Sequence, residues 1–305
     1  MLKENSEPNK KNGGQIREHP TVPDDNTWLF LEDSFIKYSP SRKQLTVSQE
    51  LKTRESLHDF VIRLGSGLKL DSRTILAATV YINRFYMRMP ITTSKYYVAC
   101  AAIAISCKLN DNYRPPDKIA MAGCVIKNPN KKIDEQSDVF WSWRDQLLYR
   151  EELILKHLNF DLNLHLPYSI RDDLSRLLCQ DSSATERNTK VTEILKNTVS
   201  LIEVLSSLPI LVAYDINTLF ASMLIVVMFE AKERFGTDDD KLQISIKSVT
   251  LFLHVDPNIC FKCYQYSLKL LKLCNSEDPK LVSHKNASRK LRHMDHKTFF
   301  DLANS

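Results

Sequence analysis

Two long segments without a polar face constrain the fold more than any other feature of the sequence. They are residues 93–109 (TSKYYVACAAIAISCKL) and residues 215–231 (DINTLFASMLIVVMFEA), and both mix small with large apolar side chains. A helix of this texture is stable in water only when other helices enclose it on every side. Each segment is the third in a run of predicted helices, so the sequence indicates an all-α protein built from a duplicated five-helix unit.

The rest of the chain is organised around these two runs. Capping residues place the first helix between Thr46 or Ser48 and a stop at Gly65 and Gly67, and the second helix after Asp71 or Ser72. The helices of the second run are expected at residues 168–178, 191–208, 216–235, 244–254 and 257–274. The predicted parts are a disordered tail at 1–26, an N-terminal helical segment at 27–45, a first repeat at 46–162, a second repeat at 163–275 and a flexible basic tail at 276–305.

Composition agrees with a helical protein and argues against several other classes. Only 6 of the 305 residues are glycine, too few for a sheet protein with many tight turns, and 43% are apolar. The net charge of +5 is small for a dedicated nucleic-acid binder. No apolar stretch could cross a membrane and the N-terminus lacks a signal-peptide core, so we expect an intracellular protein with no membrane partner. Its 7 cysteines are then expected to be buried thiols.

No motif for catalysis, a cofactor or a metal stands out. Gly65-Ser-Gly67 is too short for a phosphate-binding loop and is better explained as a helix terminator. Cys260 and Cys263 have the chemistry of zinc ligands, but a helix that starts near Pro257 would place Cys263 in its apolar stripe. We therefore expect no catalytic residue, no cofactor and no metal site.

Two charged residues interrupt apolar helix faces in the first run. Lys108 follows Ala104 at helical spacing, near the end of the most enclosed helix. Glu151 lies between Leu147 and Leu155 on the inward stripe of the last helix. The two side chains could pair on a surface that a partner completes, or Lys108 could extend to solvent while Glu151 faces water. The pattern alone leaves both alternatives open.

The sequence blocks around these residues resemble a cyclin box. Four blocks match in order and spacing between residues 54 and 162, namely TRESLHDFVIRLGSGLKL, TILAATVYINRFYMRMPI, VACAAIAISCKLNDNYRPP and LLYREELILKHLNFDL. Upstream, WLFLEDSFIKYSPSR resembles the Trp-rich segment of the transcriptional cyclins of types C, K, T and L, and VFWSWRDQLLYREE resembles fungal relatives of cyclins T and K. The resemblance covers residues 27–275, more weakly in the second half, and implies two tandem five-helix cyclin-box repeats.

The resemblance also implies a kinase-binding site. In cyclins, a lysine that closes the third helix and a glutamate in the fifth form the polar centre of the kinase contact, and Lys108 and Glu151 stand at the matching positions. The implied kinase-binding residues are Lys108, Glu151, Arg54, Leu147, Ile154 and Leu155. The chain departs from the family at Asn83, where an Asp or His is usual. The substrate-docking patch of cell-cycle cyclins is matched only by Arg54 and Leu57, so we do not expect that docking function.

By resemblance, the chain is a regulatory subunit and not an enzyme. It would bind a cyclin-dependent kinase as a heterodimer in the nucleus and promote phosphorylation of the RNA polymerase II C-terminal domain and transcription elongation. One alternative is a general transcription factor of the TFIIB kind, which binds DNA and polymerase with the same fold but commonly has an N-terminal zinc ribbon, whereas no cysteine precedes Cys100. Another alternative is a helical scaffold. Nucleic-acid contact by the basic tail is less favoured than simple solvation.

Overall fold

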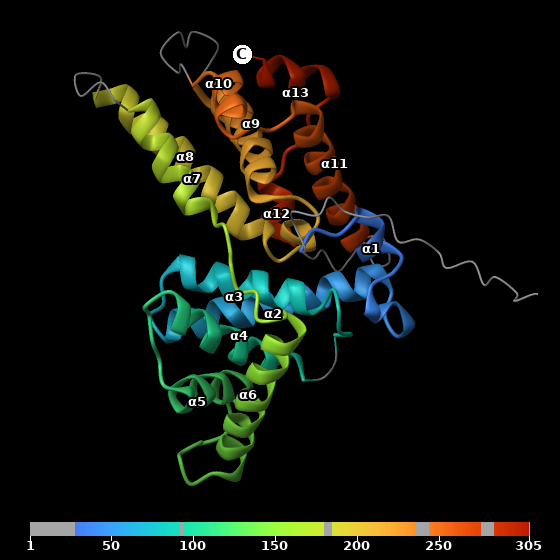
Figure 1. Cartoon of the computed structure of the whole chain (residues 1–305), viewed down its shortest axis with the longest axis vertical. Helices are drawn as coiled ribbons and strands as arrows, with labels where there is room; N and C mark the ends of the chain where they lie inside the picture. The colour runs from blue at the N-terminus through green and yellow to red at the C-terminus, as the bar shows by residue number, and fades with distance from the viewer. Residues whose placement is uncertain (1–27, 92–93, 180–184, 236–243, 276–283, 305) are drawn as a thin grey trace, which may run out of the picture.

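The structure is a computed structural model that describes residues 28–91, 94–179, 185–235, 244–275 and 284–304, so the predicted tail at 1–26 lies outside the described residues. All regular structure in the described part is helical. Figure 1 shows two helical bodies, one formed by α2 to α6 and the other by α7 to α13, with α1 beside their junction. This arrangement confirms the predicted all-α fold with two tandem repeats.

The helices follow the predicted order along the chain. Their bounds are α1 Glu32–Ile36, η1 Pro40–Lys43, α2 Val47–Gly67, α3 Ser72–Phe85, α4 Lys95–Leu109, α5 Pro116–Lys127, α6 Asp138–His157, α7 Pro167–Leu178, α8 Thr185–Leu205, η2 Pro209–Val212, α9 Ile216–Phe235, α10 Ile246–Phe252, α11 Pro257–Cys274, α12 Lys285–Lys290 and α13 His296–Ala303. The start of α8 was predicted six residues too late. The reason is that its first turns are polar and carry no apolar period.

The predicted caps fix the starts of α2 and α3. Thr46 Oγ1 accepts the backbone N–H of Gln49 at 3.2 Å while Gln49 Oε1 accepts that of Thr46 at 3.1 Å, which forms a capping box. Asp71 Oδ1 accepts the backbone N–H of Thr74 at 2.7 Å. Gly65 does not end α2 as predicted. It lies inside the helix, where its missing side chain lets α3 approach closely, since a Cβ at Gly65 would stand 2.6 Å from Ile75 Cδ1.

Helix α4 is the centre of the first repeat, as its texture predicts. Every residue from Val98 to Cys107 is buried, among α2, α3, α5 and α6. Gly123 on α5 permits the close approach of α5 to α4 and α6, since a Cβ there would lie 2.6 Å from Cys100 Sγ and 3.0 Å from Trp143. Helix α9 has the equivalent position in the second repeat, with residues 218–228 all buried.

The N-terminal segment holds the two repeats together. Trp28 belongs to the core of the first repeat and its indole N–H donates to Asp161 at 2.7 Å. Phe35 belongs to the core of the second repeat, and the Tyr214 hydroxyl of that repeat donates to Glu32 at 2.6 Å. The segment therefore belongs to the folded molecule and contributes to both cores.

Direct hydrogen bonds also join α2 and α3 to the second repeat. Asn83 Nδ2 donates to the carbonyl of Ser206 at 2.9 Å, and Ser48 Oγ donates to the carbonyl of Cys274 at 3.0 Å. All four residues are buried, and polar groups left unpaired in such a region would be costly. Asn83, which departs from the family pattern, thus has a structural role at the repeat junction.

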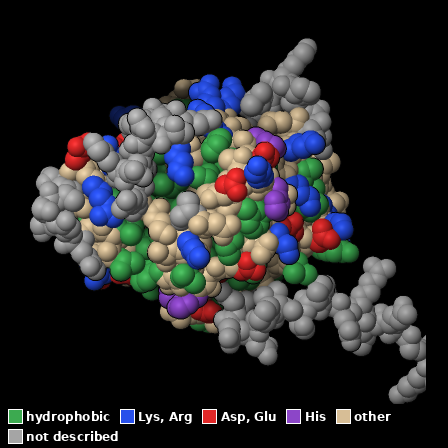
Figure 2. All heavy atoms as spheres, turned by 90° about the horizontal axis from the view of Figure 1, so that it is seen from above, with side chains coloured by type: hydrophobic (Ala, Val, Ile, Leu, Met, Phe, Trp, Pro, Cys, Tyr) green, Lys and Arg blue, Asp and Glu red, His purple; other side chains and the backbone are tan. Residues whose placement is uncertain are grey.

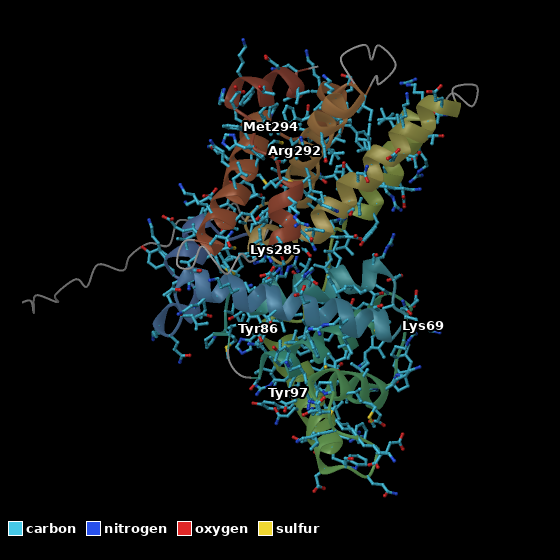
Figure 3. The ribbon with its side chains drawn as sticks, turned by 180° about the vertical axis from the view of Figure 1, so that it is seen from behind. Lys69, Tyr86, Tyr97, Lys285, Arg292 and Met294 are labelled. Carbon is cyan, nitrogen blue, oxygen red and sulfur yellow. The ribbon has the colours of Figure 1, made fainter. Side chains whose placement is uncertain are left out.

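The flexible tail predicted from residue 276 is wrong for residues 284–304. These residues form α12 and α13, and Leu291, Met294, Phe299 and Leu302 are buried in the core of the second repeat. The Phe299 ring lies 5.1 Å from that of Phe261, between centroids. Figure 3 shows Lys285 at the repeat junction and Met294 in the upper body. The limits of the two repeats themselves stay a prediction.

On the face of the second repeat that Figure 2 shows, neither positive nor negative side chains dominate the surface. In Figure 2, which looks down on that end of the molecule, lysine and arginine side chains are interspersed with acidic and apolar ones. None of the helices in the described residues is both long and apolar enough to span a bilayer.

Candidate functional site

Lys108 and Glu151 meet as the sequence suggests. Lys108 lies in the last turn of α4, and its ammonium forms an ion pair with the Glu151 carboxylate on α6. The negative end of the α4 dipole favours a cation at this position. The Lys108 side chain is 46% exposed and that of Glu151 is 13% exposed. The ion pair therefore lies at the surface. Its lysine keeps much more contact with water than a lysine inside the helical core would.

Apolar side chains flank this pair on the same two helices. Leu109 on α4 is 50% exposed and Leu148 on α6 is 40% exposed. Leu148, Glu151 and Leu155 have helical spacing and share one face of α6, and Leu155 is half-buried. We call Lys108, Leu109, Leu148, Glu151 and Leu155 the α4–α6 surface. It combines one ion pair with an exposed apolar rim, a composition suited to a protein partner.

Three predicted contact residues lie inside the molecule instead. Leu147 and Ile154 have no exposed surface and belong to the core of the first repeat. Arg54 is 3% exposed. In this structure other residues of the chain enclose these side chains, and their contact with a kinase stays a prediction. Their role is to support the helices that carry the surface.

Arg54 is the centre of a buried polar network. Its Nη2 donates to Glu50 Oε1 at 2.8 Å and its Nη1 donates to Asn83 Oδ1 at 2.8 Å. Its guanidinium carbon lies 5.2 Å from the Phe35 ring centroid and 5.9 Å from that of Tyr86. The network joins α2 to α3 and to the N-terminal segment.

The α4–α6 surface extends along α6 in a way that was not predicted from the sequence. Trp141 is 46% exposed and lies seven residues before Leu148, on the same side of the helix. The guanidinium carbon of Arg144 lies 5.3 Å from a Trp141 ring centroid, and its Nε donates to Asp117 of α5 at 2.5 Å. The regular spacing of Trp141, Leu148 and Leu155 in the sequence could have predicted this extension.

The cysteines offer no reactive thiolate in the first repeat. Burial raises the pKa of Cys107 to about 11 and raises that of Cys100 further. At neutral pH both are thiols. Among the described residues no group of His, Cys, Asp and Glu side chains is arranged to hold a metal ion.

Comparisons with known proteins agree with this picture. Residues 26–163 match the family model for the cyclin N-terminal domain. The chain is 29% identical to cyclin pch1 of Schizosaccharomyces pombe over 171 residues, which cover 55% of this chain and 50% of pch1. It is 28% identical to Cyclin-T1-3 of Arabidopsis thaliana, covering 57% of each protein. It is 26% identical to Cyclin-T1 of Mus musculus, covering 47% of this chain and 20% of that protein.

The fold resembles a solved structure over most of the chain. A chain in the crystal structure of the yeast RNA Pol II CTD kinase CTDK-1 complex superposes with a TM-score of 0.57 at 12% identity, covering 90% of this chain and 82% of that chain. At this identity the likeness shows the fold alone. It extends across both repeats, whereas the family model covers the first.

The fold and the family match together define an all-α chain of two helical repeats, of which the first matches the cyclin N-terminal domain. Through this domain the chain is similar to cyclin pch1 and to cyclins of type T. It spans about half of the length of pch1 and a smaller share of the mouse relative.

Proposed function

We propose that this chain binds and activates a cyclin-dependent kinase of the transcriptional type, and that the α4–α6 surface receives the kinase. The Lys108–Glu151 pair, flanked by the exposed Leu109 and Leu148, is the observation that supports this most directly. A protein kinase is active when its αC helix is positioned so that the glutamate of that helix pairs with the phosphate-binding lysine. A cyclin surface that packs on αC stabilises this position.

The ion pair would fix the register of the docked helix. The Lys108 ammonium has three donors and uses one on Glu151, while the Glu151 carboxylate has several acceptor sites. The remaining donors and acceptors are available for backbone groups of a partner helix. Burial of Leu109, Leu148 and Leu155 against apolar residues of that helix would supply affinity, at about 25 cal/mol for each Å² removed from water.

We further propose that the kinase substrate is the C-terminal domain of RNA polymerase II, that the complex promotes elongation and that it acts in the nucleus. Support comes from the similarity to cyclin T proteins and from the fold shared with a chain of the yeast CTD kinase complex. The relatives reported above are cyclins and not factors of the TFIIB kind, so the cyclin function is the better supported of the two.

Exchanging the two charges tests the proposed surface. The variant Lys108→Glu with Glu151→Lys keeps an ion pair between α4 and α6, so it should fold with unchanged helical content. It should bind the kinase about tenfold or more weakly, because the donors and acceptors presented to the partner are reversed. The measurement is the amount of kinase that co-purifies with the tagged chain, identified by mass spectrometry, together with circular dichroism.

The matched control exchanges the charges of Asp173 and Arg176, an exposed ion pair on α7 of the second repeat. This control should recover as much kinase as the wild type. Recovery of no kinase by the wild-type chain would contradict the proposed function as a whole. Normal kinase recovery by the Lys108 and Glu151 exchange would instead remove these two residues from the interface.

A further inference from the structure

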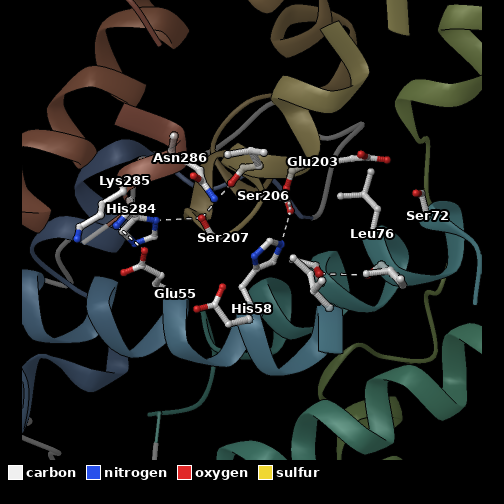
Figure 4. A pocket seen from close by; sticks show the side chains of 16 residues that line it. Glu55, His58, Ser72, Leu76, Glu203, Ser206, Ser207, His284, Lys285 and Asn286 are labelled. Atoms are coloured by element: carbon white, nitrogen blue, oxygen red, sulfur yellow. Dashed lines mark hydrogen bonds between the residues drawn. The ribbon is translucent and has the colours of Figure 1, made fainter. Parts of the chain in front are cut away.

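A cleft between the two repeats lies outside the α4–α6 surface. It has a volume of about 400 Å³, with α2 and α3 on one side and the end of α8 and the start of α12 on the other. Figure 4 shows Glu55 and His58 on one wall and Glu203, Ser206 and Ser207 on the opposite wall. A cleft of this size falls in the range of sites that enclose a small ligand or a few side chains of a peptide.

The polar part of the cleft is acidic. Glu55, Asp59 and Glu203 line the cleft. Among the described residues that line it, Lys285 is the only Lys or Arg. The Glu203 carboxylate accepts the Tyr168 hydroxyl at 2.6 Å, and that of Glu55 accepts the backbone N–H of His284. Each carboxylate keeps acceptor sites for another donor. In the described part of the chain, none of the three forms an ion pair with a Lys or Arg.

The two histidines of the cleft do not offset this negative charge at neutral pH. Burial lowers the pKa of His58 to about 4, and burial also lowers that of His284. Both rings have partners already, because His58 Nε2 lies 3.2 Å from Ser206 Oγ and His284 Nδ1 lies 3.0 Å from Ser207 Oγ. The carboxylates therefore determine the sign of the potential in the cleft.

Aliphatic side chains form the rest of the lining. Ile62 is 44% exposed and lies one turn after Asp59 on α2. It therefore provides an apolar surface directly beside the acidic residues of the cleft. Ile75, Leu76, Val204 and Ala287 complete the apolar lining. A ligand that fits this surface needs a cationic group and an adjacent aliphatic part. Lysine and arginine have both, in a charged end and an apolar stem.

We propose that the cleft binds a short peptide segment of a partner protein, with a Lys or Arg side chain between Asp59 and Glu203 and a neighbouring aliphatic side chain against Ile62. The acidic wall would repel the phosphates of a nucleic acid, which excludes that class of ligand. The site does not use Arg54 or Leu57, the two positions that match the docking patch of cell-cycle cyclins. It also contains no residue of the α4–α6 surface, so it goes beyond the kinase contact.

Selection from a library of short random peptides displayed on phage tests this inference with the full chain as target. We expect enriched peptides to share a Lys or Arg next to Leu, Ile or Val. An enriched peptide, synthesised with a fluorescent label, is then titrated with the protein and followed by anisotropy. Asp59→Asn and Glu203→Gln should each weaken its binding about fivefold, because each removes one charge while keeping a side chain of the same size.

Two control variants make the result specific. Glu193→Gln removes an exposed carboxylate of α8 outside the cleft and should leave the peptide affinity unchanged. The Lys108 and Glu151 exchange should also leave it unchanged, which separates this site from kinase binding. The inference is overturned if no peptide is enriched, if enriched peptides lack a basic residue, or if Asp59→Asn with Glu203→Gln binds as well as the wild type.

Discussion

Glu50 has no exposed surface, yet its charge is balanced by two guanidinium groups. Arg42 Nη2 lies 2.7 Å from one carboxylate oxygen and Arg54 Nη2 lies 2.8 Å from the other. The Ser39 hydroxyl donates to the same carboxylate at 2.8 Å. A buried charge of this kind is tolerated only because its partners remain in place. At the scale of single residues, this network is therefore the most sensitive part of the molecule.

Replacing Arg54 tests that sensitivity. Arg54→Met keeps the apolar stem but leaves Glu50 with one guanidinium fewer and Asn83 Oδ1 without its donor. The free energy of unfolding, measured by urea denaturation, should fall by about 3 kcal/mol. Lys37→Met is the control, since Lys37 is paired with Asp33 on an exposed helix surface and should matter little. Equal effects of the two substitutions would show that the Arg54 network is not stabilising.

The sequence predicted the polar residues of the α4–α6 surface but not which neighbours are accessible. Lys108 and Glu151 were predicted because a charged residue that interrupts an apolar stripe can be recognised in the sequence alone. Leu147, Ile154 and Leu155 all belong to the apolar stripe of α6. Only the packing of α4 against α6 decides which of these side chains is enclosed. The partners of Arg54 come from other helices as well as its own, so its burial could not be predicted from α2 alone.

At the scale of helices, two glycines with different surroundings give a matched test. A Cβ on Gly123 would stand 2.6 Å from Cys100 Sγ, whereas one on Gly67 would meet nothing within 4 Å. Gly123→Ala should lower the free energy of unfolding by about 1–3 kcal/mol because α5 must move away from α4. Gly67→Ala, at the end of α2, should be neutral or stabilising. Thermal denaturation of both variants distinguishes these outcomes, and a stable Gly123→Ala would mean that α5 adapts without cost.

Long helices with an apolar period were predictable, whereas the two short helices of the C-terminal segment were not. The segments that became α4 and α9 were recognised because each contains a run of at least seven consecutive apolar residues. Helices α12 and α13 have only 6 and 8 residues, too few for a period to emerge from a basic, polar stretch. Their formation depends on docking of Phe299 and Leu302 into the second repeat.

At the scale of the whole molecule, the junction between the repeats should respond to pH. Burial, with a smaller contribution from His284, lowers the pKa of His58 to about 4, below its unfolded value of 6.5. As the pH falls below 6.5 the unfolded chain takes up this proton before the folded one does, so the stability is lost progressively towards pH 4. The contribution of one such group is at most about 1.4 kcal/mol for each pH unit.

The variant His58→Gln should therefore lose less stability than the wild type between about pH 7 and about pH 5, as measured by urea denaturation at both values. Glutamine retains a polar atom that can reach Ser206 but carries no titrating ring. His165→Gln, at an exposed position in the chain between the repeats, is the control and should follow the wild type. Parallel pH profiles for all three proteins would contradict a role of His58.

The packed C-terminal helices have a practical consequence for recombinant work. Hydropathy suggests trimming the chain at residue 275, yet Phe299 packs against Phe261 and Tyr264, and Leu302 lies in the same core. A protein shortened there would leave these aromatic faces open to water and invite self-association. The same cut would remove His284, whose backbone N–H and ring contact Glu55 and Leu51 of the first repeat. Poor solubility of such a fragment would result from the loss of α12 and α13, which cover the core of the second repeat.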